Sequence, residues 1–429
     1  MSNTHKDSAN AVFNKEKHTI LIPDLFPVHM ELLADMLRSY GYRAEIVRTS
    51  DRGVLDTGLK YIHNDMCYPA ICSNGQLLHA VLEGGYDLDK IALLQVQTGG
   101  GCRASNYVLL LKKAMEKLEL EHIPVISLSF TSLFSDNGTG FRLTIPMLLT
   151  TLAALTYGDM MMLLSNQIRP YEINAGDTKA TMDRWYARIK EDFSLKTSPI
   201  FRLKRNLRKM VEDFKRIPVL RTEKTKVGIV GEVYVKFSAL GNNGLEAFLD
   251  TQDCEYMLPG VLGFIHYCLS HAPVDYKLYG GSFKDKVVNQ IFQSVLQKFE
   301  SMPADALRDS PEFVTPATFR EMQVYGERVL PHGVKMGEGW YLSAEMVELI
   351  EHGYNNIICT QPFGCLPNHI VGKGVIRRFR EIYPEANICP IDYDASASSV
   401  NQENRIKLML AVAKDTSGVR RTSHAAVNA

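Results

Sequence analysis

The stretch that decides the fold is KIALLQVQ at residues 90–97, followed by TGGGC at residues 98–102. A short, nearly continuous apolar run is typical of a buried strand, and the apolar spacing over residues 104–118 is that of a helix. A strand that leads into a helix is the repeating unit of a parallel α/β sheet. The N-terminal part repeats this alternation, with strands predicted at residues 19–23, 43–48, 90–97 and 124–129, helices at 27–40, 69–82 and 104–118, and a loop at 49–65.

A second series of strands and helices occupies the C-terminal part of the chain. It starts at KVGIVGEVYV, residues 226–235, after a mainly helical region at residues 141–217. Ser343 is interpreted as the cap of a helix that runs to residue 352. The other predicted elements are helices at 244–250, 368–383 and 401–414 and strands at 356–359 and 388–392.

These patterns predict an α/β protein with two Rossmann-like parallel-sheet domains that face a cleft, joined by a helical connecting region. A chain of 429 residues is longer than one ordinary core requires. Ligands of open parallel sheets bind at the carboxyl ends of the strands, so we expect the site in that cleft. The predicted parts are a disordered N-terminus at 1–17, an N-terminal α/β domain at 18–140, a helical connector at 141–225, a C-terminal α/β domain at 226–414 and a disordered tail at 415–429.

Composition and charge argue against several classes of protein. Hydrophobic residues make up 45% of the chain, and 48 basic side chains balance 48 acidic ones, so no net field attracts nucleic acid. The N-terminus has no signal pattern, and the longest apolar run, residues 145–164, is interrupted by Pro146, Gly158 and Asp159. We interpret that run as a buried helix, and the mixed-charge basic segment at residues 201–226 as a solvated helix face. We therefore expect a cytoplasmic protein that binds neither nucleic acid nor a membrane.

Three of the eight cysteines lie where a strand or loop leads into a helix. Cys67 and Cys365 each begin a Cys-x-Pro element, and Cys102 ends the glycine turn. Proline favours the first helical position, so each of these cysteines lies beside a helix N-terminus, where the dipole lowers the pKa of a thiol and makes it a better metal ligand. Glycine lets the backbone approach a bulky inorganic group closely. We expect the three sulfurs to form one site.

The pattern of these cysteines favours an iron–sulfur cluster over zinc. Structural zinc usually draws paired ligands two to four residues apart, and the sequence has no Cys-x-x-Cys. Three thiolates leave one iron without a protein sulfur, open to water, a hydroxyl oxygen or substrate. Cys359 is a candidate fourth ligand, although its place at a strand end suits a buried thiol equally. The cysteines without such flanks are interpreted as buried apolar side chains: Cys254, Cys268 and Cys389.

Polar and glycine residues beside the three cysteines are candidates for the surrounding contacts that tune such a site. Asp65, shortly before Cys67, is interpreted as a helix cap, while His63 and Asn64 are candidate donors. The candidate neighbours of the ligands are Gln97, Thr98, Gly99, Gly100, Gly101, Arg103, Thr360, Gln361, Asn368 and His369.

The same residues carry a family resemblance. The segments HNDMCYP at 63–69, QTGGGCRASNY at 97–107 and CTQPFGCLPNH at 359–369 resemble the 2-hydroxyacyl-CoA dehydratase superfamily. More narrowly, the chain is similar to the activase-related, dehydratase-like region that often follows ATP-binding activase domains in large proteins of anaerobes. The similarity extends to VGEVY at 230–234, PIDYD at 390–394 and NQEN at 401–404.

The resemblance implies an oxygen-sensitive 4Fe-4S cluster held by Cys67, Cys102 and Cys365, in a lyase or an iron–sulfur reductase component. In the dehydratases a separate activator uses ATP to drive one electron to the cluster, and a 2-hydroxyacyl-CoA loses water through a radical. Because the chain has no Walker lysine motif, the ATP-dependent activator would be a partner. Relatives reduce acyl-CoA or small molecules, and some hold a double cubane, which the flanks of the other cysteines do not favour. A homodimer or heterodimer is expected.

The residues leave the reaction open. Nothing in the sequence marks a coenzyme A pocket or a base that removes a β-proton, and similarity of fold is weak evidence for a reaction. The alternatives are a non-catalytic electron-transfer or cluster-scaffold component and, less favoured, a structural zinc protein.

Overall fold

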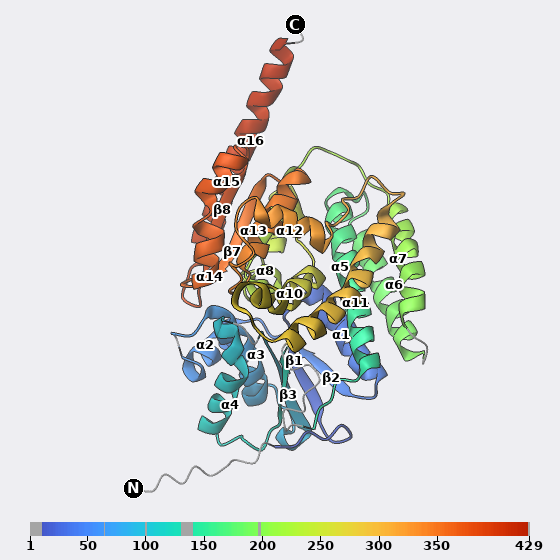
Figure 1. The fold of residues 1–429 in the computed structure, drawn as a ribbon, viewed down its shortest axis with the longest axis vertical. Helices are drawn as coiled ribbons and strands as arrows, with labels where there is room; N and C mark the ends of the chain where they lie inside the picture. Colours follow the sequence, from blue (N-terminus) through green and yellow to red (C-terminus); the bar gives the residue numbers. More distant parts are fainter. Residues whose placement is uncertain (1–10, 64, 99–100, 130–139, 196–198, 428–429) are drawn as a thin grey trace.

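The computed structural model describes residues 11–63, 65–98, 101–129, 140–195 and 199–427. It is an α/β structure with two four-stranded sheets, both parallel throughout, as predicted (Figure 1). The strand order is β2-β1-β3-β4 in one sheet and β6-β5-β7-β8 in the other, so the two sheets share one topology.

The N-terminal sheet follows the predicted elements closely. Ile20 and Leu21 point to opposite faces of β1 and both are fully buried, so both faces of this sheet are covered. The strands are β1 (Thr19–Pro23), β2 (Arg43–Val47), β3 (Ile91–Gln97) and β4 (Val125–Ser129), and the helices are α1 (Pro27–Ser39), α3 (Tyr68–Glu83) and α4 (Tyr107–Lys117).

The prediction of a loop at residues 49–65 is wrong, because helix α2 (Arg52–Tyr61) lies there. This helix packs against α3 through glycines on both helices. A Cβ on Gly58 would lie 2.3 Å from the carbonyl oxygen of Ile71, and one on Gly75 would lie 2.6 Å from that of Val54. The glycines that weaken the helical pattern in the sequence are therefore what allows the two backbones to touch.

The C-terminal sheet has the second series of elements. Its strands are β5 (Thr225–Gly231), β6 (Cys254–Met257), β7 (Asn356–Pro362) and β8 (Asn387–Tyr393). The helices that follow them are α8 (Val233–Phe237), α9 (Leu245–Asp250), α13 (Gly339–Glu351), α14 (Leu366–Asn368), a π-helix (His369–Lys373), α15 (Ile376–Ile382) and α16 (Ser399–Val427).

Two predicted boundaries in this part are wrong. Ser343 does not cap a helix, because α13 begins at Gly339 and the buried Ser343 hydroxyl donates to the carbonyl of Val371 at 3.4 Å. Helix α16 continues to Val427, so it extends into the tail that was predicted to be disordered.

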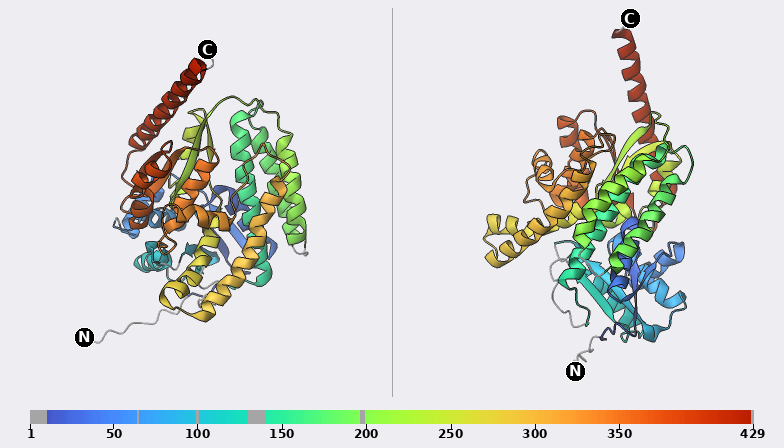
Figure 2. Two further views of the ribbon diagram at one scale, coloured as in Figure 1. Left: turned by 45° about the horizontal axis from the view of Figure 1, so that its top comes forward. Right: turned by 90° about the vertical axis from the view of Figure 1, so that its right-hand side faces the viewer.

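Long helices connect and cover the two sheets (Figure 2). Helix α5 (Ile145–Ile168) contacts α1, β6, α10 and α11, and so bridges the two sheet regions. It belongs to the one described segment, Ile145–Tyr171, long and apolar enough to cross a membrane, but 78% of the apolar window is buried inside the protein. The other helices are α6 (Asp177–Ser194), α7 (Pro199–Lys215), α10 (Val261–Tyr279), α11 (Phe283–Leu307) and α12 (Phe319–Glu327).

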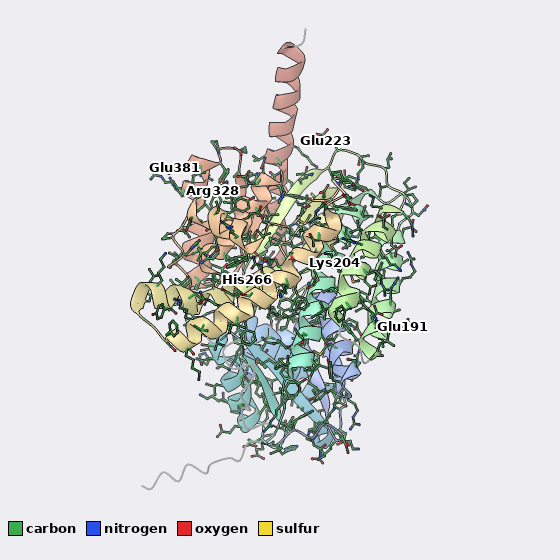
Figure 3. All side chains as sticks on the ribbon, turned by 45° about the vertical axis from the view of Figure 1, so that its right-hand side comes forward. Glu191, Lys204, Glu223, His266, Arg328 and Glu381 are labelled. Carbon is green, nitrogen blue, oxygen red and sulfur yellow. The ribbon has the colours of Figure 1, made fainter. Side chains whose placement is uncertain are left out.

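The basic segment contains α7, and its charges lie on a solvated face as predicted. Leu203, Leu207 and Phe214 of this helix are fully buried in the core. Several of the charged side chains pair with acidic ones, as Lys204 does with Asp305 at 3.2 Å (Lys204 is labelled in Figure 3).

The regions beyond the carboxyl ends of the two sheets contact each other. Arg52 donates to the carbonyl of Ala395 at 2.6 Å, and Tyr68 to that of Leu240 at 3.3 Å. These contacts join the start of α2 and of α3 to the segments after β8 and α8. The structure therefore brings together the edges at which parallel sheets bind ligands.

Candidate functional site

Each of the three cysteines immediately precedes a helix. Cys67 is the N-cap of α3, Cys102 of a short 3₁₀ helix (Arg103–Asn106) after β3, and Cys365 of α14 after β7. We predicted that the proline of each Cys-x-Pro element is the first helical residue. It is the second, because helices α3 and α14 begin at Tyr68 and Leu366. An N–H at the first or second helical position has no partner within the helix, so proline, which has no N–H, fits at either position.

The prediction that the pKa values of these thiols are lowered is wrong for the protein without a bound group. A backbone N–H of the first helical turn lowers the pKa of each thiol: that of Ala70 for Cys67, Ala104 for Cys102 and Asn368 for Cys365. Burial acts in the other direction and is the larger effect. It raises the pKa of Cys67, and raises the pKa values of Cys102 and Cys365 to about 12. These thiols are therefore protonated at neutral pH and would release protons on binding a metal.

The three cysteines share one electrostatic neighbour, Glu232. Its carboxylate raises the pKa of Cys67, of Cys102 and of Cys365, and Cys67 does the same to Cys102. We call Cys67, Cys102 and Cys365 the three-cysteine site.

Glu232 follows β5 directly, and its backbone position is set by a glycine. Gly231 has φ 141°, and a Cβ there would lie 1.9 Å from the carbonyl oxygen of Thr360 on the neighbouring strand β7. The N–H of Glu232 donates to that same oxygen at 2.9 Å, and its own carboxylate accepts from the N–H of Val235 at 2.8 Å. Glu232 therefore caps α8.

A second carboxyl, that of Glu338, joins the start of α8 to the neighbourhood of Cys365. One of its oxygens accepts from the N–H of Val233 at 3.3 Å, and the other accepts from the Asn368 side-chain amide at 2.7 Å. The same amide nitrogen lies 3.4 Å from the Cys365 sulfur. Asn368, predicted as a neighbour of the site, therefore holds a thiol and a carboxyl together.

Both carboxyls have raised pKa values. Burial is the main cause in each case, and for Glu232 the negative charge of Glu338 adds to it, so that its pKa rises to about 8. Neither glutamate was among the predicted site residues. The signals were Gly231-Glu232 after a strand and Gly337-Glu338-Gly339, in which both glycines flanking Glu338 have positive φ.

Contacts between chain segments hold the N-terminal side of the site in place. The Tyr107 hydroxyl lies 3.2 Å from the Cys67 sulfur. Arg103 donates to the carbonyl of Asp65 at 2.6 Å, which ties the turn at Cys102 to the segment before Cys67. Asp65 does not cap α3, since Cys67 occupies the N-cap position.

A glycine also sets the contact between the two sides of the site. A Cβ on Gly101 would lie 2.1 Å from the sulfur of Met336, two residues before Glu338. The turn that carries Cys102 therefore lies directly against the segment that carries the second carboxyl.

The C-terminal neighbours are held by one acidic residue, Asp392. It accepts from the Gln361 amide and from Lys373, both at 2.6 Å. His369 contacts the carbonyl of Cys365 at 2.8 Å. The remaining predicted neighbours, Gly99 and Gly100, and the candidate donor Asn64 lie outside the described residues.

Polar atoms without partners gather at the ends of β3 and β7. They are Oε1 of Gln97, the last residue of β3, and Oγ1 of the next residue, Thr98, together with Oε1 of Gln361 near the end of β7 and Asn368 Oδ1 in α14 after it. Such buried atoms are normally hydrogen bonded. Others occur elsewhere in the described chain, but these four all belong to residues predicted to surround the ligands. They fit a bound group that supplies their partners, and the thiols fit a group that binds sulfur.

Cys359, the candidate fourth ligand, lies within β7 and is fully buried in the hydrophobic core. A Cβ on Gly372 would lie 2.9 Å from its sulfur, so this sulfur packs against the π-helix. Of the cysteines predicted to be buried, Cys254 is buried, whereas Cys268 and Cys389 are partly buried.

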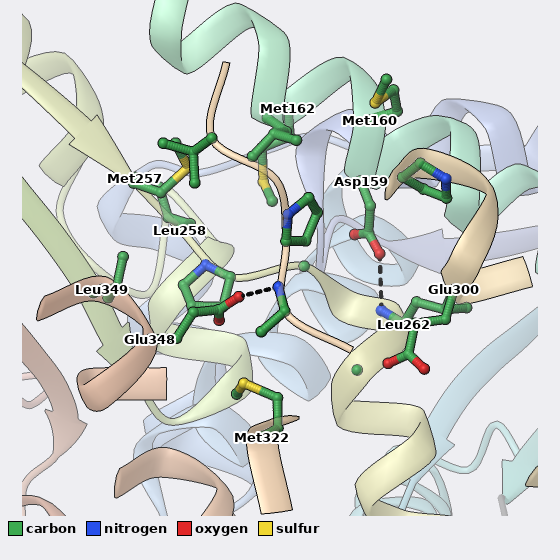
Figure 4. Close-up of a pocket in the computed structure, with 18 of the residues that line it drawn as sticks. Asp159, Met160, Met162, Met257, Leu258, Leu262, Glu300, Met322, Glu348 and Leu349 are labelled. Carbon is green, nitrogen blue, oxygen red and sulfur yellow. Dashed lines mark hydrogen bonds between the residues drawn. The ribbon is translucent and has the colours of Figure 1, made fainter. Parts of the chain in front are cut away.

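Within the described residues, no group of three or more His, Cys, Asp or Glu side chains is arranged to hold a single metal ion. A single zinc ion needs ligands that converge on one point at about 2.0–2.3 Å, whereas a cluster spreads its thiolates over several irons. A cavity of about 90 Å³ lies elsewhere, between α5, α10 and α13, where Asp159 accepts from Leu262 and Glu348 from Ala317 (Figure 4). No residue of the three-cysteine site lines it.

In comparisons with known proteins, the chain matches no family model and no curated protein.

Proposed function

We propose that this protein holds a 4Fe-4S cluster on Cys67, Cys102 and Cys365 and belongs to the 2-hydroxyacyl-CoA dehydratase type. The observation that carries the proposal is the placement of these cysteines. All three are helix N-cap residues, and Cys102 and Cys365 lie in the turns that follow β3 and β7. The charge of Glu232 raises the pKa of all three thiols. Thiolate ligands from distant segments suit a cluster in a cleft between the two sheets.

The topology supports the same location. In each sheet the chain leaves the first strand toward one edge and later returns to its other side, which makes β1/β3 and β5/β7 the switch points. Ligands of open α/β sheets bind beside the carboxyl ends of such strands. Cys102 follows β3, Glu232 follows β5 and Cys365 follows β7.

In the proposed reaction the protein receives low-potential electrons from a separate ATP-dependent activator and uses them for radical dehydration or reduction of an acyl-CoA or small substrate. The bound cluster would supply one-electron chemistry. The chain's own residues would hold it: thiolates as ligands, the Asn368 amide as a donor to Cys365 sulfur, and Tyr107 beside Cys67. Such an enzyme would work in the cytoplasm under anaerobic conditions.

An anaerobic experiment tests this proposal. Protein purified without oxygen is analysed for iron and acid-labile sulfide, and its electron paramagnetic resonance is recorded before and after dithionite. We expect Cys67→Ala, Cys102→Ala and Cys365→Ala each to abolish the signal, and Cys254→Ala and Cys359→Ala to retain it. Loss of the signal in Cys359→Ala would establish a fourth protein ligand. A change in the signal on adding acyl-CoA thioesters is expected for an enzyme, whereas an electron carrier would show none.

A further inference from the structure

The cavity of about 90 Å³ between α5, α10 and α13 is separate from the three-cysteine site, and its wall combines sulfur-containing and acidic side chains. Methionines from three segments line it: Met162 of α5, Met257 of β6 and Met322 of α12. Three carboxyls line it as well: Asp159, Glu300 and Glu348, all labelled in Figure 4. An apolar wall with a few placed polar groups is typical of a site for a small molecule.

One of these carboxyls, Asp159, is already fully used by the fold. Its carboxylate accepts from the N–H of Val261 at 2.7 Å and from that of Leu262 at 3.0 Å, at the start of α10. It also lies 2.8 Å from Nε2 of the buried His29. Asp159 therefore fixes α10 to α5 and leaves the other two carboxyls for a ligand.

Glu348 is buried without a cation of its own. It is 9% exposed, and one of its oxygens accepts from the N–H of Ala317 at 2.7 Å. Its second oxygen has no hydrogen-bond partner among the residues that the structure describes. Lys236, whose charge acts on Glu348, is already bound to Glu345 at 2.9 Å. Buried carboxylates are normally paired, so Glu348 lacks the partner that such a group requires.

The rest of the described wall does not supply that partner. It contains neither lysine nor arginine, and burial lowers the pKa of its histidine, His352, which favours the neutral ring. Burial also raises the pKa of Glu348 to about 7, which is the expected result for a carboxyl that lacks a cation. A cation from outside the chain would remove this cost.

Two further acceptors face the same cavity. Tyr341 is 4% exposed, and its hydroxyl lies against Gly263 of α10, where a Cβ would be 2.0 Å from the hydroxyl oxygen. This hydroxyl has no hydrogen-bond partner within the described parts of the chain. The Glu300 side chain is 13% exposed, and its carboxylate lies 3.3 Å from Nδ1 of His266. The wall therefore presents unused acceptors from α11 and α13.

We propose that this cavity binds a short aliphatic ammonium cation, with its charge beside Glu348 and its alkyl chain against the methionines. An ammonium group has three N–H donors and no acceptor, which matches a wall whose unused groups are the carboxylates and a phenol. An apolar cavity of about 150 Å³ holds benzene, so this smaller one suits a shorter, unbranched chain. Methionine side chains are flexible enough to close around such a chain. This site does not depend on the proposed cluster.

The test is calorimetric titration of the full-length protein with n-propylammonium chloride at pH 8, above the pKa of Glu348. Propan-1-ol has the same chain without the charge, and potassium chloride supplies a cation without N–H donors. We expect n-propylammonium to bind about tenfold or more tightly than either, and benzylammonium, which is too large, to bind more weakly. Binding of n-propylammonium no tighter than that of propan-1-ol or of potassium overturns the inference, as does tighter binding of benzylammonium.

Two variants locate the binding. Glu348→Gln keeps the size of the side chain and an acceptor for Ala317 but removes the charge, so affinity should fall about tenfold or more. The urea midpoint of the protein without ligand should not fall, because an unpaired buried charge is lost. Tyr341→Phe removes one acceptor and should weaken binding about two- to tenfold.

The matched control is Glu246→Gln on α9. Glu246 is a partly buried glutamate whose pKa burial raises to about 6, and it does not line the cavity. This variant should bind n-propylammonium like wild type. Wild-type affinity in both Glu348→Gln and Tyr341→Phe, or an equal loss in Glu246→Gln, overturns the inference. Neither result bears on the iron content by which the cluster proposal is judged.

Discussion

The two sheets have the same strand order, yet they contribute different chemistry to the site. Each has a Cys-x-Pro element in which the cysteine caps a helix. The N-terminal side adds a second cysteine, Cys102, and a phenol, Tyr107. The C-terminal side adds the two carboxyls. The same sheet topology therefore carries two of the three cysteines on the N-terminal side, and one cysteine with both carboxyls on the C-terminal side.

The two sides also differ in the kind of substitution that should destabilise them most. The N-terminal side relies on close backbone contact, as between α2 and α3, and its core cluster there is apolar. The C-terminal side buries ionised groups, among them the Lys236–Glu345 pair, whose side chains are 1% and 3% exposed. Breaking one partner of such a pair leaves an uncompensated charge, which costs more than a small steric clash.

The largest expected effect is therefore on the C-terminal side. Lys236→Met leaves Glu345 buried without its cation and should lower the free energy of unfolding by about 3–5 kcal/mol at neutral pH, measured by urea denaturation. The pKa of Glu345 is already raised by burial, so the loss should shrink as pH falls and this carboxyl takes up a proton. Lys204→Met breaks an exposed pair and serves as control, with about 0–1 kcal/mol expected. Equal effects of the two variants would contradict the comparison.

On the N-terminal side, Gly58→Ala should force α2 away from α3. The added Cβ would meet the Ile71 carbonyl at 2.3 Å, and the resulting shift should cost about 1–3 kcal/mol of unfolding free energy. Gly281→Ala is the matched control, because a Cβ there meets no atom closer than 3.8 Å. If Gly58→Ala unfolds at the same urea concentration as wild type, the contact between the helices is not as close as described.

Across the site, Glu232→Gln should change the reactivity of the thiols in metal-free protein. The Glu232 carboxylate raises the pKa values of all three cysteines, so its removal lowers them and increases the thiolate fraction. Alkylation by iodoacetamide should become about two- to tenfold faster above pH 8, and converge with wild type at lower pH, where Glu232 is itself protonated. Glu246→Gln, whose carboxyl has its pKa raised to about 6 by burial and lies beside Arg169, should alkylate like wild type.

The smallest effects should distinguish the two Cys-x-Pro elements. Tyr107→Phe removes the hydrogen bond that lowers the pKa of Cys67, and Asn368→Ala removes the one that lowers the pKa of Cys365. Each variant should slow alkylation of its own cysteine about two- to tenfold, as resolved by peptide mass analysis, and leave the other unchanged. Slowing of both cysteines by one variant would show that the two sides are not independent.

Much of the fold could be predicted from sequence because strand and helix periods are local. The strands at β1, β3 and β4 lie where the apolar runs are. Helix α2 was missed because Gly53 and Gly58 argue locally against a helix, and only the packing against α3 explains them. Ser343 failed as a cap because α13 starts earlier, at Gly339, whose φ of 47° is a tertiary requirement.

The cysteines of the candidate site could be predicted because each has a recognisable flank. The two carboxyls of the candidate site could not be predicted, because their place beside the cysteines depends on contacts between distant segments. Val233 and Glu338 lie 105 residues apart in the chain and meet through one hydrogen bond. The raised pKa values of the thiols likewise follow from burial, which outweighs the helix N-terminus and is not visible in sequence.

The measurement that tests the central claim most directly is the iron and acid-labile sulfide content of anaerobically purified protein, with zinc measured in the same sample. The account predicts iron and sulfide in equal amounts, about four of each per chain, and loss of both in Cys67→Ala, Cys102→Ala and Cys365→Ala. Stoichiometric zinc without iron, or full iron content in all three variants, would contradict it.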